Sequence, residues 1–204
     1  MPDFSIEREA VRFGYNKIAG VDEVGRGALF GPVTAAAVIF PESTISGKTP
    51  AWMDEINDSK LLSPKKRERL AEAIFLSAYS VGIGFASNSE IDQRNIYFAS
   101  LDAMSRAVKN CCRQPDFLLV DGFNLNSVHY KQKRIPKGDR KSLSIAAASI
   151  VAKVIRDDLI CRMDPVFKGY CLSKNKGYGT KDHFKGLKDL GVTALHRKSF
   201  NLHG

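Results

Sequence analysis

The stretch from Ile18 to Pro32, IAGVDEVGRGALFGP, constrains the fold more than any other part of the chain. Its apolar start is typical of a short buried strand, and the glycines that follow forbid regular structure. Two carboxylates, Asp22 and Glu23, stand where that strand is expected to end. Hard divalent cations prefer carboxylate oxygens, and glycines let backbone N–H groups approach a ligand closely. We therefore expect a metal site beside a bound ligand, with a polar hairpin turn as the alternative for this stretch alone.

Asp22 and Glu23 pose a geometric difficulty, because adjacent side chains on a regular strand point to opposite faces of the sheet. Both can reach one metal cluster only if the strand ends, twists or bulges there. Arg26 follows between two glycines, where it adds a fixed positive charge that suits a phosphate.

A second apolar run repeats this arrangement later in the chain. Residues 116–120, DFLLV, are expected to form a buried strand, and Asp121 and Gly122 follow at its carboxyl end. Ligands in α/β folds gather at the carboxyl ends of neighbouring strands. Asp121 is therefore expected to converge with Asp22.

Asp139 is a further candidate acid, because it stands just before a long helix expected at 142–163. The helix would present Asp139 to a metal and a polar stripe that includes Lys153 and Arg156 to a substrate. Asp157 is a rival carboxylate. It follows Lys153 by four residues, a spacing that favours an ion pair on the helix surface.

Hydrophobic periodicity along the whole chain predicts strands and helices that together make an α/β fold. Residues 41–57 are predicted as loop, and 87–92 as a turn or the entry to a short helix. No internal repeat or low-complexity linker divides the 204 residues, so we expect one domain over 1–204. Strands are expected at 18–21, 33–40, 80–86, 116–120 and 129–135, and helices at 1–16, 63–79, 95–112, 142–163 and 180–190.

The net charge of +9 lies in the C-terminal third of the chain. Residues 1–130 carry 14 Lys and Arg against 16 Asp and Glu, whereas residues 131–204 carry 17 against 6. A basic region beside an acidic cluster is a footprint for a polyanion held over metal ions. A solvated surface is the alternative explanation for the charge alone.

The N-terminal sequence is charged where a signal peptide needs an apolar core, and no run approaches the length of a membrane span. We therefore predict a cytoplasmic protein. The four cysteines lack the paired spacing of a zinc site, and we expect them to be reduced packing residues: Cys111, Cys112, Cys161 and Cys171.

A set of motifs runs in one order along residues 18–200. Its members are DEVGRG from Asp22 with Gly31-Pro32, DSKLLSPKKRE from Asp58, Asp121-Gly122, KGD from Lys137, SIAAASIVAKVIRD from Ser144, GYGT from Gly177 followed by His183, and GVTALHRKSF from Gly191. Each motif alone is weak, but the ordered set is highly specific. Together they resemble the type 2 ribonuclease H family, and bacterial ribonuclease HII in particular.

The resemblance implies a ribonuclease H-like mixed sheet of about five strands flanked by helices. A basic, helical subregion of the same domain is expected at about 165–204. The resemblance also implies that four residues are the active-site acids and hold two divalent cations, Mn²⁺ or Mg²⁺. These acids are Asp22, Glu23, Asp121 and Asp139.

Further site residues follow from the same resemblance. Gly25, Arg26 and Gly27 are expected to read the 2′-hydroxyl of a ribonucleotide from their backbone, since only close main-chain approach can sense one hydroxyl oxygen. Tyr178 matches the tyrosine that packs on the sugar next to the cleavage point, with a loop aromatic that caps the core as the alternative. The side chains predicted to contact phosphate are Lys60, Lys153, Arg156, His183 and Arg197.

The activity implied is that of a metal-dependent endoribonuclease. It would hydrolyse the RNA strand of RNA/DNA hybrids and cleave 5′ of ribonucleotides embedded in duplex DNA, leaving 3′-hydroxyl and 5′-phosphate ends. We expect a monomer that acts in ribonucleotide excision repair and DNA replication without contacting a membrane, and the sequence leaves protein partners open. The alternatives are a ribonuclease HIII-type hybrid nuclease, against which the Gly-Arg-Gly sequence argues, and a non-catalytic nucleic-acid-binding module, against which four acids argue.

Overall fold

The computed structural model describes residues 1–203 and contains a mixed sheet of five strands. β1 pairs antiparallel with β2, and β2 with β3, whereas β4 runs parallel to both β1 and β5. The strand order is β3-β2-β1-β4-β5, so β1 lies at the centre, and the predicted mixed α/β sheet is confirmed. The strands are β1 (Ile18–Val24), β2 (Val33–Ile39), β3 (Ser80–Ala86), β4 (Phe117–Asp121) and β5 (Lys131–Ile135).

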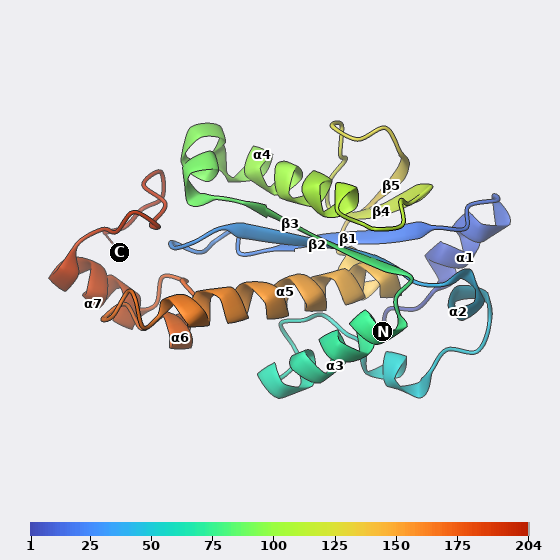
Figure 1. Ribbon diagram of the computed structural model, residues 1–204, viewed down its shortest axis with the longest axis horizontal. Helices are drawn as coiled ribbons and strands as arrows, with labels where there is room; N and C mark the ends of the chain where they lie inside the picture. The colour runs from blue at the N-terminus through green and yellow to red at the C-terminus, as the bar shows by residue number, and fades with distance from the viewer. Residues whose placement is uncertain (204) are drawn as a thin grey trace.

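Helices cover both faces of this sheet (Figure 1). α4 lies on one face and α5 on the other, and α3 packs against α5. α6 and α7 lie together at one end of the molecule. No helix among residues 1–203 has the length and apolarity that crossing a membrane requires. The helices are α1 (Ser5–Arg12), α2 (Glu42–Ser46), α3 (Pro64–Ser77), α4 (Asn88–Lys109), α5 (Leu143–Met163), α6 (Leu172–Asn175) and α7 (Lys181–Leu190), with short 3-10 helices η1 (Ala51–Glu55) and η2 (Gly138–Arg140).

Three predicted boundaries differ in the structure. β1 continues to Val24, because it keeps its pairing with β2 beyond the predicted end. α4 begins at Asn88, but Asn95 interrupts it with φ 68° and ψ 165°. The Asn95 side chain accepts a hydrogen bond from the Tyr97 backbone N–H at 2.9 Å and so starts the second part, which matches the predicted helix. Residues 41–57, predicted as loop, contain α2 and η1.

α1 anchors the start of α5, a role that the sequence did not reveal for the first sixteen residues. Glu7 is fully buried, and its Oε1 accepts hydrogen bonds from the Ser142 hydroxyl at 2.6 Å and the Ser144 backbone N–H at 2.9 Å. Ser142 in turn caps α5 by accepting from the Ile145 N–H at 3.2 Å. Burial raises the pKa of Glu7. An acid in this position also complements the positive end of the helix dipole.

β1 and α5 are in direct backbone contact at Gly20. A Cβ atom there would lie 2.1 Å from the carbonyl carbon of Ser144 and 2.3 Å from the backbone nitrogen of Ile145. Neither atom belongs to a side chain that can move aside, so only glycine fits. The contact places the start of α5, and Asp139 just before it, over the end of β1 that carries Asp22.

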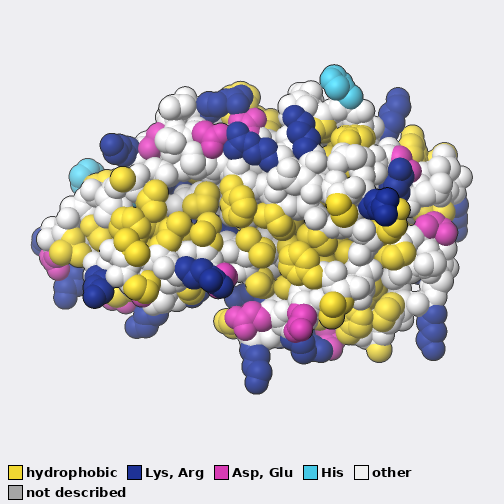
Figure 2. Space-filling model, in the orientation of Figure 1, with side chains coloured by type: hydrophobic (Ala, Val, Ile, Leu, Met, Phe, Trp, Pro, Cys, Tyr) yellow, Lys and Arg dark blue, Asp and Glu magenta, His cyan; other side chains and the backbone are white. Residues whose placement is uncertain are grey.

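Lys and Arg side chains are spread over the surface. Figure 2 shows them at several points around one face, including the end formed by α6 and α7, with apolar side chains between them. Lys174, Lys181 and Lys185 in these helices are exposed. On this face the positive charge is therefore distributed and does not form one compact patch.

Replacing Gly20 with alanine should destabilise the protein by about 3 kcal/mol or more, because the added methyl group would overlap backbone atoms of α5. Gly27→Ala is the matched control, since nothing lies within 4 Å of a Cβ at that position. We expect the control to stay within about 1 kcal/mol of the unsubstituted protein. Urea unfolding followed by circular dichroism measures both free energies, and equal values for the two variants would contradict the close contact.

Candidate active site

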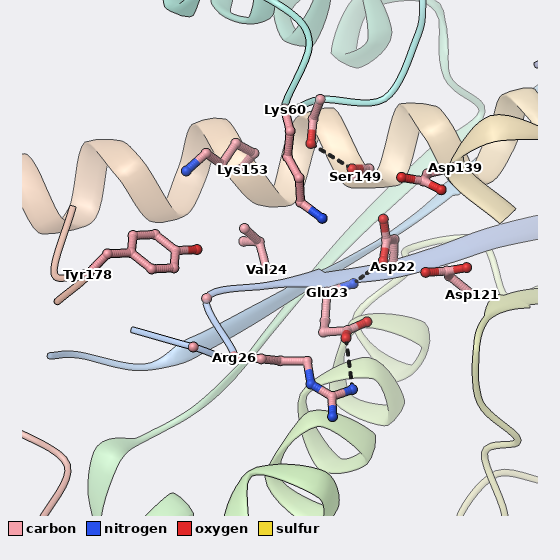
Figure 3. Close-up of a pocket in the computed structure, with 13 residues that line it drawn as sticks. Asp22, Glu23, Val24, Arg26, Lys60, Asp121, Asp139, Ser149, Lys153 and Tyr178 are labelled. Atoms are coloured by element: carbon pink, nitrogen blue, oxygen red, sulfur yellow. Dashed lines mark hydrogen bonds and ion pairs between the residues drawn. The ribbon is translucent and has the colours of Figure 1, made fainter. Parts of the chain in front are cut away.

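A pocket of about 320 Å³ opens where the ends of β1 and β4 meet the start of α5 (Figure 3). All four predicted acids line it: Asp22 and Glu23 from β1, Asp121 from the end of β4, and Asp139 from η2. The parallel pairing of β1 with β4 puts both carboxyl ends at the same edge of the sheet, as the sequence predicted for Asp22 and Asp121.

Asp22 and Glu23 both line the pocket although β1 stays regular. Both residues keep their register with β2, so the bulge or strand end that seemed necessary is absent on that side. On the other side, the pairing of β1 with β4 ends at Val21. The two side chains leave opposite faces of β1, with Asp22 on the side of the other acids and Glu23 toward Arg26 (Figure 3). Because β4 no longer pairs with β1 beyond Val21, both Asp22 and Glu23 can reach the pocket.

Hydrogen bonds hold one oxygen of each of three acids. Oδ1 of Asp22 accepts from the Glu23 backbone N–H at 2.7 Å, and Oδ1 of Asp121 accepts from the Gly138 N–H at 2.6 Å. Oε1 of Glu23 accepts from Nη1 of Arg26 at 3.2 Å, whereas its Oε2 is buried without a partner. These contacts orient the carboxylates and leave a second oxygen of each for a ligand.

The electrostatics of the pocket disfavour a fully ionised cluster. Burial raises the pKa of Asp22 well above its usual range, and the charges of Glu23 and Asp121 raise it further. Burial also raises the pKa of Glu23, although the nearby Arg26 opposes this shift. The pKa of Asp139 is raised by burial and then by neighbouring acids. Positive charge brought into the pocket would relieve this repulsion.

The donor set fits hard divalent cations. Carboxylate oxygens are the ligands such ions prefer, and the unpartnered Oε2 of Glu23 is an atom that an ion would satisfy. Among residues 1–203, no three ligand side chains already form a coordinating group. The residues that would hold the ions are Asp22, Glu23, Asp121 and Asp139.

The loop after β1 requires glycine at position 25. The φ of Gly25 is +92°, and a Cβ there would lie 2.1 Å from Nε of Arg156. The Cβ position of Gly27 has no neighbour within 4 Å, so its backbone is accessible to a ligand in the pocket that it lines. Arg26 also lines the pocket, but its guanidinium pairs with Glu23. All three residues of the predicted Gly-Arg-Gly turn therefore lie at the site.

Three of the predicted phosphate contacts are instead buried: Arg156, His183 and Arg197 have no exposed surface. Arg156 donates hydrogen bonds to three backbone carbonyls and Arg197 to two, in the loop 25–32 and at Lys176. His183 lies within hydrogen-bonding distance of a backbone carbonyl and of a second histidine. A side chain without exposed surface does not contact a phosphate. The prediction is wrong for these three, which support the walls of the pocket.

Lys60, Lys153 and Tyr178 do line the pocket. Nζ of Lys153 lies 2.9 Å from Oδ1 of Asp157, which confirms the predicted ion pair, and 5.4 Å from the centre of the Tyr178 ring. Tyr178 therefore stands at the pocket wall and is not only a cap on the core.

Asp58 and Ser59, which directly precede Lys60, have roles that the sequence did not reveal. Asp58 is buried, and its carboxylate accepts from the Lys60 backbone N–H at 3.0 Å and from Nη2 of Arg140 at 3.0 Å. Ser59 lines the pocket, and its Oγ lies 2.8 Å from Oγ of Ser149. The DSK motif places Asp58 and Ser59 beside Lys60 in the sequence, but spacing alone does not show that Asp58 binds Arg140 of η2.

Comparison with known proteins gives a consistent result. A family model described as Ribonuclease HII matches residues 19–203. A ribonuclease HII from Clostridioides difficile (strain 630) is 44% identical over 194 residues, which is 95% of this chain and 73% of that protein.

Two solved structures show the same fold at low identity. The ribonuclease H2 of Pyrococcus horikoshii OT3 has a TM-score of 0.74 at 23% identity, over 92% of this chain and 95% of that one. A Bst-RNase HIII in complex with Mn²⁺ has a TM-score of 0.66 at 17% identity, over 92% of this chain and 68% of that one. Both similarities concern the arrangement of helices and strands.

The family match covers nearly the whole chain and shows which family the chain belongs to. The ribonuclease HIII likeness is one of fold at 17% identity, whereas the Ribonuclease HII family model matches residues 19–203, the part of the chain that contains the residues lining the pocket. The relative in Clostridioides difficile is an enzyme, which argues against a module that only binds nucleic acid. The chain therefore belongs to the ribonuclease HII family and is a type 2 ribonuclease H, a hydrolase that cuts RNA strands.

Proposed function

We propose that this chain uses two divalent cations, Mn²⁺ or Mg²⁺, to hydrolyse the RNA strand of RNA/DNA hybrids and to cleave 5′ of ribonucleotides embedded in duplex DNA. The observation that carries the proposal is the presence of four acids, the loop 25–27 and Tyr178 in one pocket. The Mn²⁺ in the structurally similar ribonuclease HIII supports the choice of ion. Such an activity serves ribonucleotide excision repair and DNA replication.

In the pocket, the acidic side chains would hold the cations and a basic side chain would bind the phosphate. The bound cations would supply activation of a water molecule and neutralisation of the leaving 3′-oxygen. Asp22, Asp121 and Asp139 would hold them from one side of β1, and Glu23 from the other. Lys60 also projects into the pocket, where its ammonium group would bind a phosphate oxygen (Figure 3).

The loop and Tyr178 would read the sugar. The backbone N–H of Leu29 donates to the Gly177 carbonyl at 2.8 Å, and Ala28 forms an isolated bridge with Tyr178. These bonds keep a constant spacing between the loop backbone and the tyrosine ring. A ribose held between them would place its 2′-hydroxyl against the main chain at Gly27, where there is room for close approach.

A duplex with one ribonucleotide should be cut on the 5′ side of that nucleotide, leaving 3′-hydroxyl and 5′-phosphate ends. Water is the expected nucleophile, so the neighbouring 2′-oxygen is not consumed. Incubation with Mn²⁺, Mg²⁺ or a chelator, followed by end analysis, tests this directly. A 2′,3′-cyclic phosphate, or equal cutting in chelator, would refute the mechanism. A cut only in long hybrids would instead favour a ribonuclease HIII-type specificity.

Asp22→Asn and Asp121→Asn should each lower turnover by at least about 100-fold, because each removes a charge that would hold a cation. Binding of a hybrid should change little. Asp158→Asn is the matched control, since Asp158 is exposed and pairs with Arg162, outside the pocket. Single-turnover cleavage and fluorescence anisotropy measure the two effects.

The same variants separate ion binding from folding. Mn²⁺ at about 100 times its Kd should raise the Tm of the unsubstituted protein by about 5–10 °C, and that shift should vanish in the two site variants. Without cations the site variants should be at least as stable, since neutral side chains relieve the repulsion at Asp22. Full-rate cleavage by Asp22→Asn would rule out the assignment.

Tyr178→Ala should slow cleavage at a single ribonucleotide by about 10- to 100-fold, because the sugar loses the surface that positions it. Tyr178→Phe keeps the ring and should retain most of the rate. Rates on a single-ribonucleotide duplex and on a long hybrid, together with the free energy of unfolding, distinguish a reading role from a packing role. Parallel loss of stability and of both rates would indicate packing only.

A further inference from the structure

His183 and His196 form a buried pair that the proposed chemistry does not use. His183 lies in α7, and His196 lies in the segment that follows it. Neither has exposed surface, and their Nε2 atoms are 3.1 Å apart. A hydrogen bond between two ring nitrogens requires that one carries a proton and the other does not. The surrounding bonds determine which is which.

Two backbone groups determine which nitrogen of each ring is protonated, because an N–H can only donate and a carbonyl can only accept. The Thr193 backbone N–H, which can only donate, lies 3.0 Å from Nδ1 of His196, so that nitrogen carries no proton; the Thr193 hydroxyl, 2.8 Å from the same nitrogen, then faces a lone pair and not an N–H. The proton of His196 is therefore on Nε2, from which it is donated to Nε2 of His183. The proton of His183 is then on Nδ1, which lies 3.0 Å from the carbonyl oxygen of Tyr178. The result is a directed chain from Thr193 to Tyr178 with both rings neutral.

The surroundings support neutral rings. Burial lowers the pKa of His183, and burial together with the charge of His183 lowers the pKa of His196 to about 4. The rings of Phe30 and Tyr170 pack against His196, with centroids 5.1 and 5.0 Å away. The adjacent Arg197 directs its guanidinium to backbone carbonyls of the loop after β1. No carboxylate is among the groups that shift either histidine.

The segment 193–197 therefore reaches both walls of the pocket. Through His196 and His183 it holds the carbonyl of Tyr178. Through Arg197 it holds the carbonyls of Arg26, at 2.8 Å, and of Gly31, at 2.9 Å. One short stretch of backbone thus sets the position of the tyrosine relative to the glycine loop.

We propose that His183 and His196 are positioning residues, a neutral pair of fixed tautomers that holds Tyr178 at the correct distance from the Gly25–Gly27 loop for reading a ribose. This inference rests on the proposed function, because the spacing matters for activity only if a ribonucleotide is read there. Neither histidine touches the substrate.

The tautomers can be measured without any activity. Long-range ¹⁵N–¹H correlation spectra of the uniformly ¹⁵N-labelled protein near pH 7 should show His183 protonated on Nδ1 and His196 on Nε2. His183→Asn assigns the signals of His183, and His129→Asn and His203→Asn identify those of the two exposed histidines, which leaves the signals of His196. The reverse tautomers, or a doubly protonated ring, would overturn the proposal whatever the enzyme cuts.

Two substitutions at one position test the positioning role. His183→Leu removes the donor to the Tyr178 carbonyl, whereas His183→Asn keeps an N–H near the place of Nδ1. We expect kcat on a single-ribonucleotide duplex, per folded molecule, to fall by about 100-fold in His183→Leu and by less than about tenfold in His183→Asn, since small misplacement at a reacting centre has large effects on rate. The Kd for the duplex should stay within about threefold.

The outcomes separate the two proposals. Unchanged rates in folded His183→Leu would overturn the positioning role, as would equal losses in the Leu and Asn variants. If the unsubstituted protein fails to cut at single ribonucleotides, the proposed function fails, whereas the spectra still decide the tautomers. If His183→Leu does not fold, the spectra and the His183→Asn rate remain as the deciding measurements.

Discussion

Acidic side chains that repel one another are confined in one pocket, and the rest of the structure serves that confinement. Burial alone disfavours the ionised form of Asp22, and the charges of Glu23, Asp121 and Asp139 add to the penalty. The parallel pairing of β1 with β4 and the backbone contact at Gly20 leave the acids little freedom to move apart. A scaffold of this kind keeps mutually repelling groups together at a cost in stability.

The walls of the pocket depend on two buried arginines, Arg156 and Arg197. Arg156 and Arg197 donate hydrogen bonds to backbone carbonyls, although Nη2 of Arg197 is buried without a partner, so the two guanidinium groups shape a loop and do not meet solvent. Burial, followed by the charge of Arg156, lowers the pKa of Arg197 to about 9. Buried charge is tolerated only where hydrogen bonds replace water, and the carbonyls of an irregular loop are well suited to that. The glycine-rich loop thereby gains a fixed shape without regular secondary structure.

Apolar periodicity and strand-end carboxylates are local signals, and they were sufficient to predict the strands, the long helices and the approach of Asp121 to Asp22. The set of four acids was implied by the family resemblance. The sequence did not predict the roles of Arg156, His183 and Arg197. Each is a polar residue in a motif, which favours a surface contact, and only the folded chain shows that carbonyls from distant segments surround them. Glu7 was missed for the same reason: its partners at the start of α5 lie far along the chain.

The bond between Arg197 and the Arg26 carbonyl joins residues 171 positions apart. During synthesis the strands that carry Asp22 and Asp121 leave the ribosome well before the segment that completes the loop. A nascent chain therefore holds Asp22 and Asp121 before Arg197 is available to fix the shape of the glycine loop. The loop is the last wall of the pocket to take its final shape as this polypeptide is made.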